Sequence, residues 1–308
     1  MRWHGGEAPN PDFFIVGAPR SGTTALYRSL KHHPDVFMPE NKEPHHFGTD
    51  LKRQHKPMSR AEYLGLFASA QPRQRVGEAS PLYLYSKRAA QEIKEFAPEA
   101  QVIVMLRKPV DLIYSLYQQN LFLTFEDIPQ FSEALAAESA RKHGSRLPRS
   151  VRAIDALFYR DVGRLADQLE RYLDTFPPEQ IHATVFEDLQ HDSQAVFAGV
   201  ARFLGIDAQL LPRAVTANGP RAARNRILQR WVVHPPAPAD RVAPVLRRYP
   251  IMHRLRSWLL DSNSRPAPRP PLDPDVRKGL TREFAPQVTR LEALIGRDLT
   301  RWRPTADA

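Results

Sequence analysis

Two kinds of hydrophobic pattern alternate along the first two thirds of the chain. Residues 13–17 and 102–106 are unbroken apolar runs of the length of a buried strand, and residues 76–80 and 181–186 fit shorter strands. Apolar residues at helical spacing predict helices at residues 25–30, 86–96, 109–117, 154–176 and 193–204. Strands that alternate with helices favour a parallel sheet covered on both faces, which is an α/β fold.

The pattern weakens beyond residue 210. Residues 234–244 and 265–274 are dense in proline, which is typical of loops or linkers. An amphipathic helix is then predicted at residues 275–295, with Pro286 inside it as a possible kink. We expect a single domain over residues 1–308, comprising a flexible N-terminus (1–12), a basic, proline-rich lid or insertion (about 213–274) and a C-terminal helix (275–296).

Charge is concentrated in one part of the sequence. The net charge is +10, and residues 213–278 contain 14 Arg and Lys against 4 Asp and Glu. Such a block indicates an anionic ligand, an acidic acceptor or a membrane surface, or simply a solvated, Arg-rich surface. Residues 241–260 fit a basic amphipathic element that lies on a membrane or an anionic acceptor, although packing against the domain is the favoured interpretation.

Some classes of site and location are excluded or disfavoured by composition. The chain has no cysteine, which excludes disulfides, thiolate metal sites and a cysteine nucleophile. No apolar run reaches the roughly 18 residues of a membrane span, and the first 12 residues lack the apolar core of a signal peptide. We expect a cytoplasmic protein that binds no nucleic acid; the oligomeric state stays open.

The loop after the first predicted strand has the layout of a phosphate-binding site. It reads Gly-Ala-Pro-Arg-Ser-Gly-Thr-Thr over residues 17–24 and leads into a helix, so its free N–H groups and the helix N-terminus can bind an anion. Thr23 and Thr24 add hydroxyl donors, and Arg20 adds a guanidinium. The spacing of Gly17 and Gly22 matches an ATPase loop, but Thr23 replaces its lysine. We therefore expect a phosphate-type group held without a metal.

This loop, with its Pro-Arg-Ser-Gly-Thr-Thr core, resembles the 5′-phosphosulfate loop of sulfotransferases that use 3′-phosphoadenosine 5′-phosphosulfate (PAPS). A second similarity is Arg107 after the strand 102–106, followed eight residues later by Ser115, the pair that binds the 3′-phosphate in that family. Further motifs are typical of its heparan-sulfate-type and bacterial carbohydrate-type branch, namely Lys-Glu-Pro-His-His-Phe (42–47), Gly-Glu-Ala-Ser-Pro-Leu-Tyr (77–83) and Phe-Glu-Asp-Leu (186–189).

The resemblance extends from about residue 11 to residue 204 and resumes in the last helix. It implies a P-loop NTPase-like three-layer fold, in which helices flank a central parallel sheet. It also implies sulfuryl transfer from PAPS to a hydroxyl or amine, on a carbohydrate, a glycolipid or another small metabolite, with adenosine 3′,5′-bisphosphate (PAP) as the product and no metal requirement. The residues expected to bind PAPS are Arg20, Ser21, Gly22, Thr23, Thr24, Arg107, Ser115, Tyr159 and Arg221.

The resemblance also assigns catalytic roles. Glu43 stands where the heparan-sulfate-type branch has its general base, Arg20 would stabilise the leaving oxygens, and His45 could serve as base or support Glu43. The chain departs from the family at Arg20, where lysine is usual, and at Ala79, where relatives often have lysine. The alternatives are a P-loop kinase or nucleotide-binding protein, disfavoured by Thr23, and a protein that only binds anionic surfaces.

Overall fold

The computed structural model describes residues 9–40, 42–52, 58–148, 151, 153–212, 221–233, 259, 262–268 and 270–304. Its centre is a sheet of five parallel strands in the order β2-β3-β1-β4-β5, which confirms the predicted fold class. The strands are β1 (Phe13–Gly17), β2 (Val36–Phe37), β3 (Arg75–Ala79), β4 (Gln101–Leu106) and β5 (Ile181–Val185). Because all five are parallel, their carboxyl ends meet at one edge of the sheet, where ligands bind in folds of this type.

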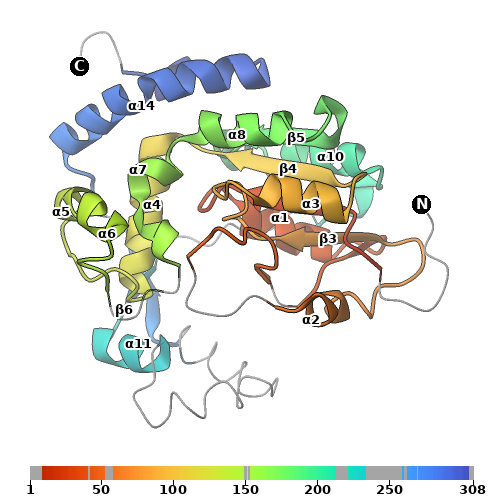
Figure 1. Ribbon diagram of the computed structural model, residues 1–308, viewed down its shortest axis with the longest axis horizontal. Coiled ribbons are helices and arrows are strands. Elements are labelled where there is room, and N and C mark those ends of the chain that lie inside the picture. Colours follow the sequence, from red (N-terminus) through yellow and green to blue (C-terminus); the bar gives the residue numbers. More distant parts are fainter. Residues whose placement is uncertain are drawn as a thin grey trace.

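Helices cover both faces of the sheet (Figure 1). The α-helices are α1 (Thr23–Lys31), α2 (Arg60–Gly65), α3 (Ala89–Phe96), α4 (Pro109–Phe122), α5 (Phe131–Ala136), α6 (Glu138–Lys142), α7 (Tyr159–Val162), α8 (Leu165–Leu173), α9 (Phe186–His191), α10 (Ser193–Leu204), α11 (Arg226–Val233) and α14 (Pro274–Ile295). The 3₁₀ segments are η1 (Ile154–Leu157), η2 (Pro178–Gln180), η3 (Ala208–Leu210) and η4 (Thr300–Trp302), and a small antiparallel pair joins β6 (Arg221–Ala223) to β7 (Ser264–Pro266).

Two hydrophobic clusters form the layers on either side of the sheet. Successive strand residues point to opposite faces, so Phe14 and Val104 belong to one cluster, while Phe13 and Ile103 belong to the other. The first cluster includes apolar residues of α3, α4, α8 and α14, and the second includes those of α1 and α10. The unbroken apolar runs of the sequence thus correspond to strands that are buried on both faces.

The expectation of one helix over residues 154–176 is wrong. The segment forms η1, α7 and α8 instead, because the backbone of Phe158 and Arg164 leaves the helical region between them. Gly163 lies at the second break, where an added Cβ would come within 2.5 Å of the Phe284 ring of α14. The close approach of α14 therefore requires a glycine at this point.

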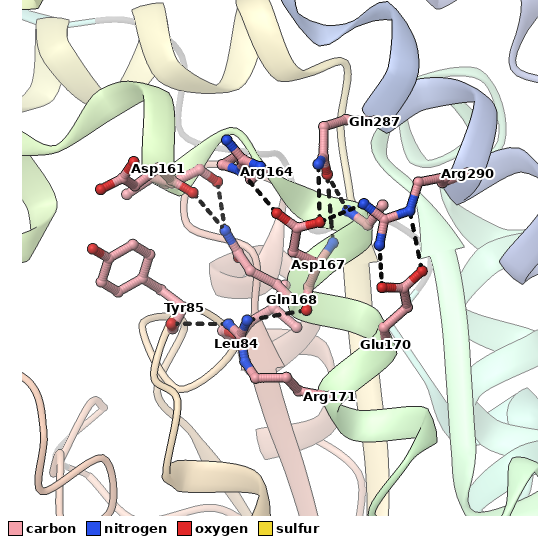
Figure 2. A network of polar contacts seen from close by, with 12 residues as sticks. Leu84, Tyr85, Asp161, Arg164, Asp167, Gln168, Glu170, Arg171, Gln287 and Arg290 are labelled. Carbon is pink, nitrogen blue, oxygen red and sulfur yellow. Dashed lines mark hydrogen bonds and ion pairs between the residues drawn. The ribbon is translucent and has the colours of Figure 1, made fainter.

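The C-terminal helix is held against α8 by a polar network (Figure 2). The Asp167 carboxylate accepts hydrogen bonds from Arg164 Nε (2.7 Å), Gln287 Nε2 (2.9 Å) and Arg290 Nη1 (2.6 Å), and Arg290 also pairs with Glu170. Pro286 lies inside α14, yet the helix continues through it. Helix α14 thus completes the layer that covers α4 and α8, as Figure 1 shows.

Several predicted features lie outside the described residues. These are residues 1–8 of the N-terminus, and, in the basic segment, residues 213–220, 234–258, 260–261 and 269. In the part of the chain that the structure does describe, no helix has the length and apolar character needed to cross a bilayer.

Candidate active site

The phosphate-type loop lies at the carboxyl end of β1, at the centre of the sheet. Gly22 precedes α1 with a φ of 92°, and a Cβ at this position would come within 2.4 Å of Leu189 Cδ2, so the turn requires glycine. No side chain among the described residues caps α1, and its first turn has no acidic residue. The N-terminus of α1 is therefore electrostatically suited to an anion, with the hydroxyl groups of Thr23 and Thr24 beside it.

Arg107 and Ser115, which are far from this loop in the sequence, lie next to it in space. Arg20 Nε donates a hydrogen bond to Ser115 Oγ (3.1 Å), and Arg107 Nη1 donates to the backbone carbonyl of Arg20 (2.8 Å). The Arg107 guanidinium also lies 4.4 Å from the centroid of the Phe186 ring. These contacts follow from topology, because β1 and β4 are neighbours and end at the same edge of the sheet. Arg20 thus connects the two predicted phosphate-binding elements.

The loop after β2 brings acidic and basic groups to the same place. Glu43 Oε1 pairs with Lys42 Nζ, and Glu43 Oε2 lies 3.7 Å from His45 Nε2. Burial alone would raise the pKa of Glu43, but Lys42, His45 and Arg20 outweigh it and hold the pKa below its usual range. The Glu43 side chain is 42% exposed and faces the cleft, so it is an ionised carboxylate that solvent or a substrate can reach.

Alternate backbone amides of this loop are attached to the end of β3. Glu43 N donates to the Ala79 carbonyl (3.0 Å), His45 N donates to Ser80 Oγ (3.3 Å) and Phe47 N donates to the Tyr83 hydroxyl (3.1 Å). The loop therefore follows the strand end closely, and every second residue is fixed.

Glu78 lies beneath these attachments with 0% exposure. Its carboxylate accepts hydrogen bonds from Tyr63 (2.6 Å), Ser80 Oγ (2.6 Å) and the Tyr83 hydroxyl (3.3 Å). The hydroxyls of Ser80 and Tyr83 each also accept the loop amide described above. The buried carboxylate orients the two hydroxyls, and the hydroxyls position the loop that presents Glu43 and His45.

The loops after β1 and β2 open into a single cleft with a volume of about 400 Å³. Arg20, Thr23, Lys42, Glu43 and His45 lie at one end of it. Three of these residues, Arg20, Glu43 and His45, have φ values of 63°, 65° and 55°, although none is glycine. Such backbone conformations are uncommon for non-glycine residues and cluster at functional sites. The arrangement can bind an adjacent pair of anionic groups and place a carboxylate base beside them.

Comparison with known proteins identifies the family. The model of the sulfotransferase family, described as Sulfotransfer_3, matches residues 11–209. The chain belongs to the sulfotransferase family. The crystal structure of a sulfotransferase from Alicyclobacillus acidocaldarius matches this structure with a TM-score of 0.71, and the two sequences are 30% identical. The match covers 96% of this chain and 100% of that one.

Curated relatives match 64% of the chain. Heparan sulfate glucosamine 3-O-sulfotransferase 6 of Mus musculus is 30% identical over 196 residues, which are 64% of this chain and 52% of the relative. Bifunctional heparan sulfate N-deacetylase/N-sulfotransferase 3 of Homo sapiens is 29% identical over 213 residues, 64% of this chain and 22% of the relative. The chain thus spans about half of the length of the first relative and about a fifth of the second. Family membership implies PAPS as the sulfuryl donor.

The site of this sulfotransferase differs from the sequence-based expectation at Tyr159. The ring is 0% exposed, the hydroxyl donates to Glu126 (2.9 Å), and Glu126 in turn pairs with the buried Arg141 (2.6 Å). Burial, together with the charge of Glu126, raises the pKa of Tyr159 well above its usual value. The expected contact between this side chain and a nucleotide is therefore wrong, because the side chain belongs to the core.

Two further predictions have different outcomes. The backbone of Arg221 lies in β6, but its side chain is outside the described residues, as are residues 213–220 before it. His46, which follows His45 in the motif of residues 42–47, stacks on the Tyr63 ring at 4.2 Å, and its Nδ1 lies 3.1 Å from the Met58 carbonyl. His46 thus packs under the loop, whereas His45 lines the cleft. Among the described residues, no cluster of His, Asp and Glu could hold a metal ion.

Sequence reasoning gave no role to two parts of the site. Glu78 and Ser80 were treated only as a family motif. Residues 119–149 were expected to supply acceptor contacts as a variable loop, and the continuation of α4 into the wall of the cleft was not predicted. Gln119 and Leu123 follow Ser115 at intervals of four residues, so they lie on the same face of the helix and line the cleft. This spacing could have predicted the wall, because residues four and eight positions after a ligand-binding residue lie on the same face of a helix.

Proposed function

We propose that this protein transfers a sulfuryl group from PAPS to a hydroxyl or amine of a carbohydrate-type acceptor. One observation carries the proposal: Arg20 contacts both Ser115 and Arg107, so the two phosphate-binding elements form one site beside Glu43. The loop of residues 17–24 would hold the 5′-phosphosulfate, and Arg107 and Ser115 would hold the 3′-phosphate. The names of the heparan sulfate relatives support the carbohydrate-type acceptor.

In the proposed reaction the acceptor oxygen or nitrogen attacks the sulfur in line with the bridging oxygen. The new bond to sulfur forms while the bond between sulfur and the bridging oxygen breaks, and PAP leaves with the electron pair. Glu43 accepts the acceptor's proton, since its lowered pKa keeps it ionised at neutral pH. Arg20 and the N-terminus of α1 stabilise the negative charge that develops on the leaving phosphate. Lys42 holds Glu43 in place through its ion pair.

A P-loop kinase is the second candidate, and the residues present disfavour it. Kinases and ATPases of this type use a lysine in the loop to reach the β- and γ-phosphates, and this chain has Thr23 at that position. The strand next to β1 ends in Arg107 rather than in an acidic residue that could hold Mg²⁺.

The test is transfer of labelled sulfate from PAPS to a panel of mono- and oligosaccharides. Wild type should label at least one acceptor, and Glu43→Gln should not. Glu40→Gln is the matched control, because Glu40 is only three residues away but its side chain is 90% exposed and pairs with Lys31. PAP should raise the melting temperature without Mg²⁺. If ATP with Mg²⁺ raises it and PAP does not, the proposal is wrong.

The remaining expectations stay predictions. These are the cytoplasmic location, the absence of nucleic-acid binding and a contact of residues 213–278 with an anionic surface.

A further inference from the structure

The position of Glu43 limits where an acceptor can lie. A general base must come within hydrogen-bonding distance of the proton it removes, so the reacting group of the acceptor must enter the cleft that Glu43 lines. Arg107 and Ser115 are not among the residues that line this cleft, but both contact Arg20, which does line it. If the proposed function holds, PAPS reaches the cleft with its sulfuryl end, and the rest of the cleft is free for the body of the acceptor.

The two ends of the cleft differ in chemistry. The end formed by the loops after β1 and β2 contains Arg20, Lys42, Glu43 and His45, which are all the charged or titratable lining residues that the structure describes. Twelve described residues line the remainder, and ten of them are apolar. They come from the loop after β3 (Pro81 and Leu82), α4, the segment that follows α4, residues 151–157 and the end of α11, and include Leu116, Leu123, Phe125, Val151, Leu157 and Val233.

The other two lining residues of this wall are amides at its border. Asn120 Nδ2 donates to the Ala156 carbonyl (3.0 Å) and so connects α4 to the segment of residues 154–157. Gln119 Oε1 is buried, and no group in the described part of the chain donates a hydrogen bond to it. A buried acceptor atom of this kind is costly unless a ligand satisfies it, and a hydroxyl group would do so.

We propose that the acceptor is an amphiphilic glycoside: a sugar whose hydroxyl reacts beside Glu43 and whose apolar aglycone lies against the wall that begins at Leu116 and Leu123. The sugar would donate a hydroxyl hydrogen bond to Gln119 Oε1, and the aglycone would remove the apolar wall from water. A sulfated polysaccharide fits this wall poorly, because its anionic groups would lose water there and the described residues of the wall include no cation to pair with them. This inference rests on the proposed function and specifies its acceptor class.

The experiment measures sulfate transfer from PAPS to alkyl β-glucosides with methyl, butyl, hexyl and octyl chains, all below their micelle concentrations. Each methylene that becomes buried should raise kcat/KM about fourfold, so the octyl compound should exceed the butyl compound by about 10²-fold. An N-sulfated heparan oligosaccharide is the competing acceptor. Flat kcat/KM along the alkyl series, or transfer only to the oligosaccharide, would overturn the inference.

A pair of variants tests the wall itself. Leu123→Gln keeps the volume but places an amide in the apolar wall, and it should lower the octyl-to-methyl ratio of kcat/KM about tenfold while leaving the Kd of PAP unchanged. Leu210→Gln is the matched control, because Leu210 is 48% exposed and does not line the cleft. If PAP binds but no glycoside is sulfated, the acceptor class is wrong. If PAP does not bind, the proposed function fails as well, so the two failures can be distinguished.

Discussion

Asp167 attaches the C-terminal helix to α8, and replacing it by asparagine should cost a definable amount of stability (Figure 2). Burial alone would raise the pKa of Asp167, but hydrogen bonds from Gln287, Arg164 and Arg290 lower it to about 2, against 3.8 in the unfolded chain. Taken at face value, this difference stabilises the fold by about 2.4 kcal/mol at neutral pH. Since the Asp167 side chain is 29% exposed and its arginine partners more so, solvent screening reduces the expected value to about 1 kcal/mol.

The contribution of Asp167 to the free energy of unfolding should depend on pH in a definite direction. A carboxyl whose pKa is lowered by folding stabilises the protein fully above its unfolded pKa, and the contribution disappears as the pH falls towards the folded pKa. Urea unfolding should therefore show Asp167→Asn about 1 kcal/mol less stable than wild type at pH 7, and the gap should narrow between pH 4 and pH 2. Asp174→Asn, at the exposed end of the same helix, should show no such gap. A gap that is absent at pH 7, or that stays constant down to pH 2, would refute the reasoning.

Three further predictions concern the site. Glu43→Gln should lower kcat about 10²- to 10⁴-fold in the transfer assay. Because the Glu43 pKa is lowered, wild-type kcat/KM should decline only below about pH 4.3. A decline of kcat/KM already centred near pH 6.5 would assign the base to His45 instead. Arg107→Ala should weaken PAP about 10- to 100-fold by calorimetry, through lost charge-assisted hydrogen bonds, and unchanged affinity would remove Arg107 from the phosphate site. Ser80→Ala should lower kcat but leave the Kd of PAP unchanged, because it removes the contacts of Ser80 Oγ with the His45 amide and the Glu78 carboxylate and no contact with the phosphate loop. Equal losses in both quantities would indicate general misfolding.

Local pattern was sufficient to predict the phosphate loop and four of the five strands of the sheet, whereas the two-residue strand β2 was not predicted. Residues 13–17 and 102–106 could be recognised because strands buried on both faces are continuously apolar. Residues 17–24 could be recognised because a strand, a glycine turn and a helix follow one another without interruption. Neither inference requires knowledge of a distant contact.

The errors arose where distant segments decide the structure. Tyr159 was expected at the nucleotide, but Glu126 and the buried Arg141, which come earlier in the chain, hold it in the core. Gly163, beside the second break, packs closely against Phe284, which is more than a hundred residues later. The periodicity of residues 154–176 contains no sign of either partner, so a continuous helix was the reasonable but incorrect expectation.

The structure also explains how a loop with an unfavourable backbone can present a base reliably. Positive φ values at Arg20, Glu43 and His45 each cost of order 1 kcal/mol or more, and they persist only where other contacts determine the conformation. The loop after β2 has such contacts: the β3 carbonyl of Ala79 and the hydroxyl of Ser80 fix the amides of Glu43 and His45. Because these contacts come from the end of β3, which is next to β1, the same sheet positions both the base and the phosphate loop. Their relative position therefore does not depend on the side chains that do the chemistry, so substitutions of Glu43 should remove activity without disturbing the PAPS site.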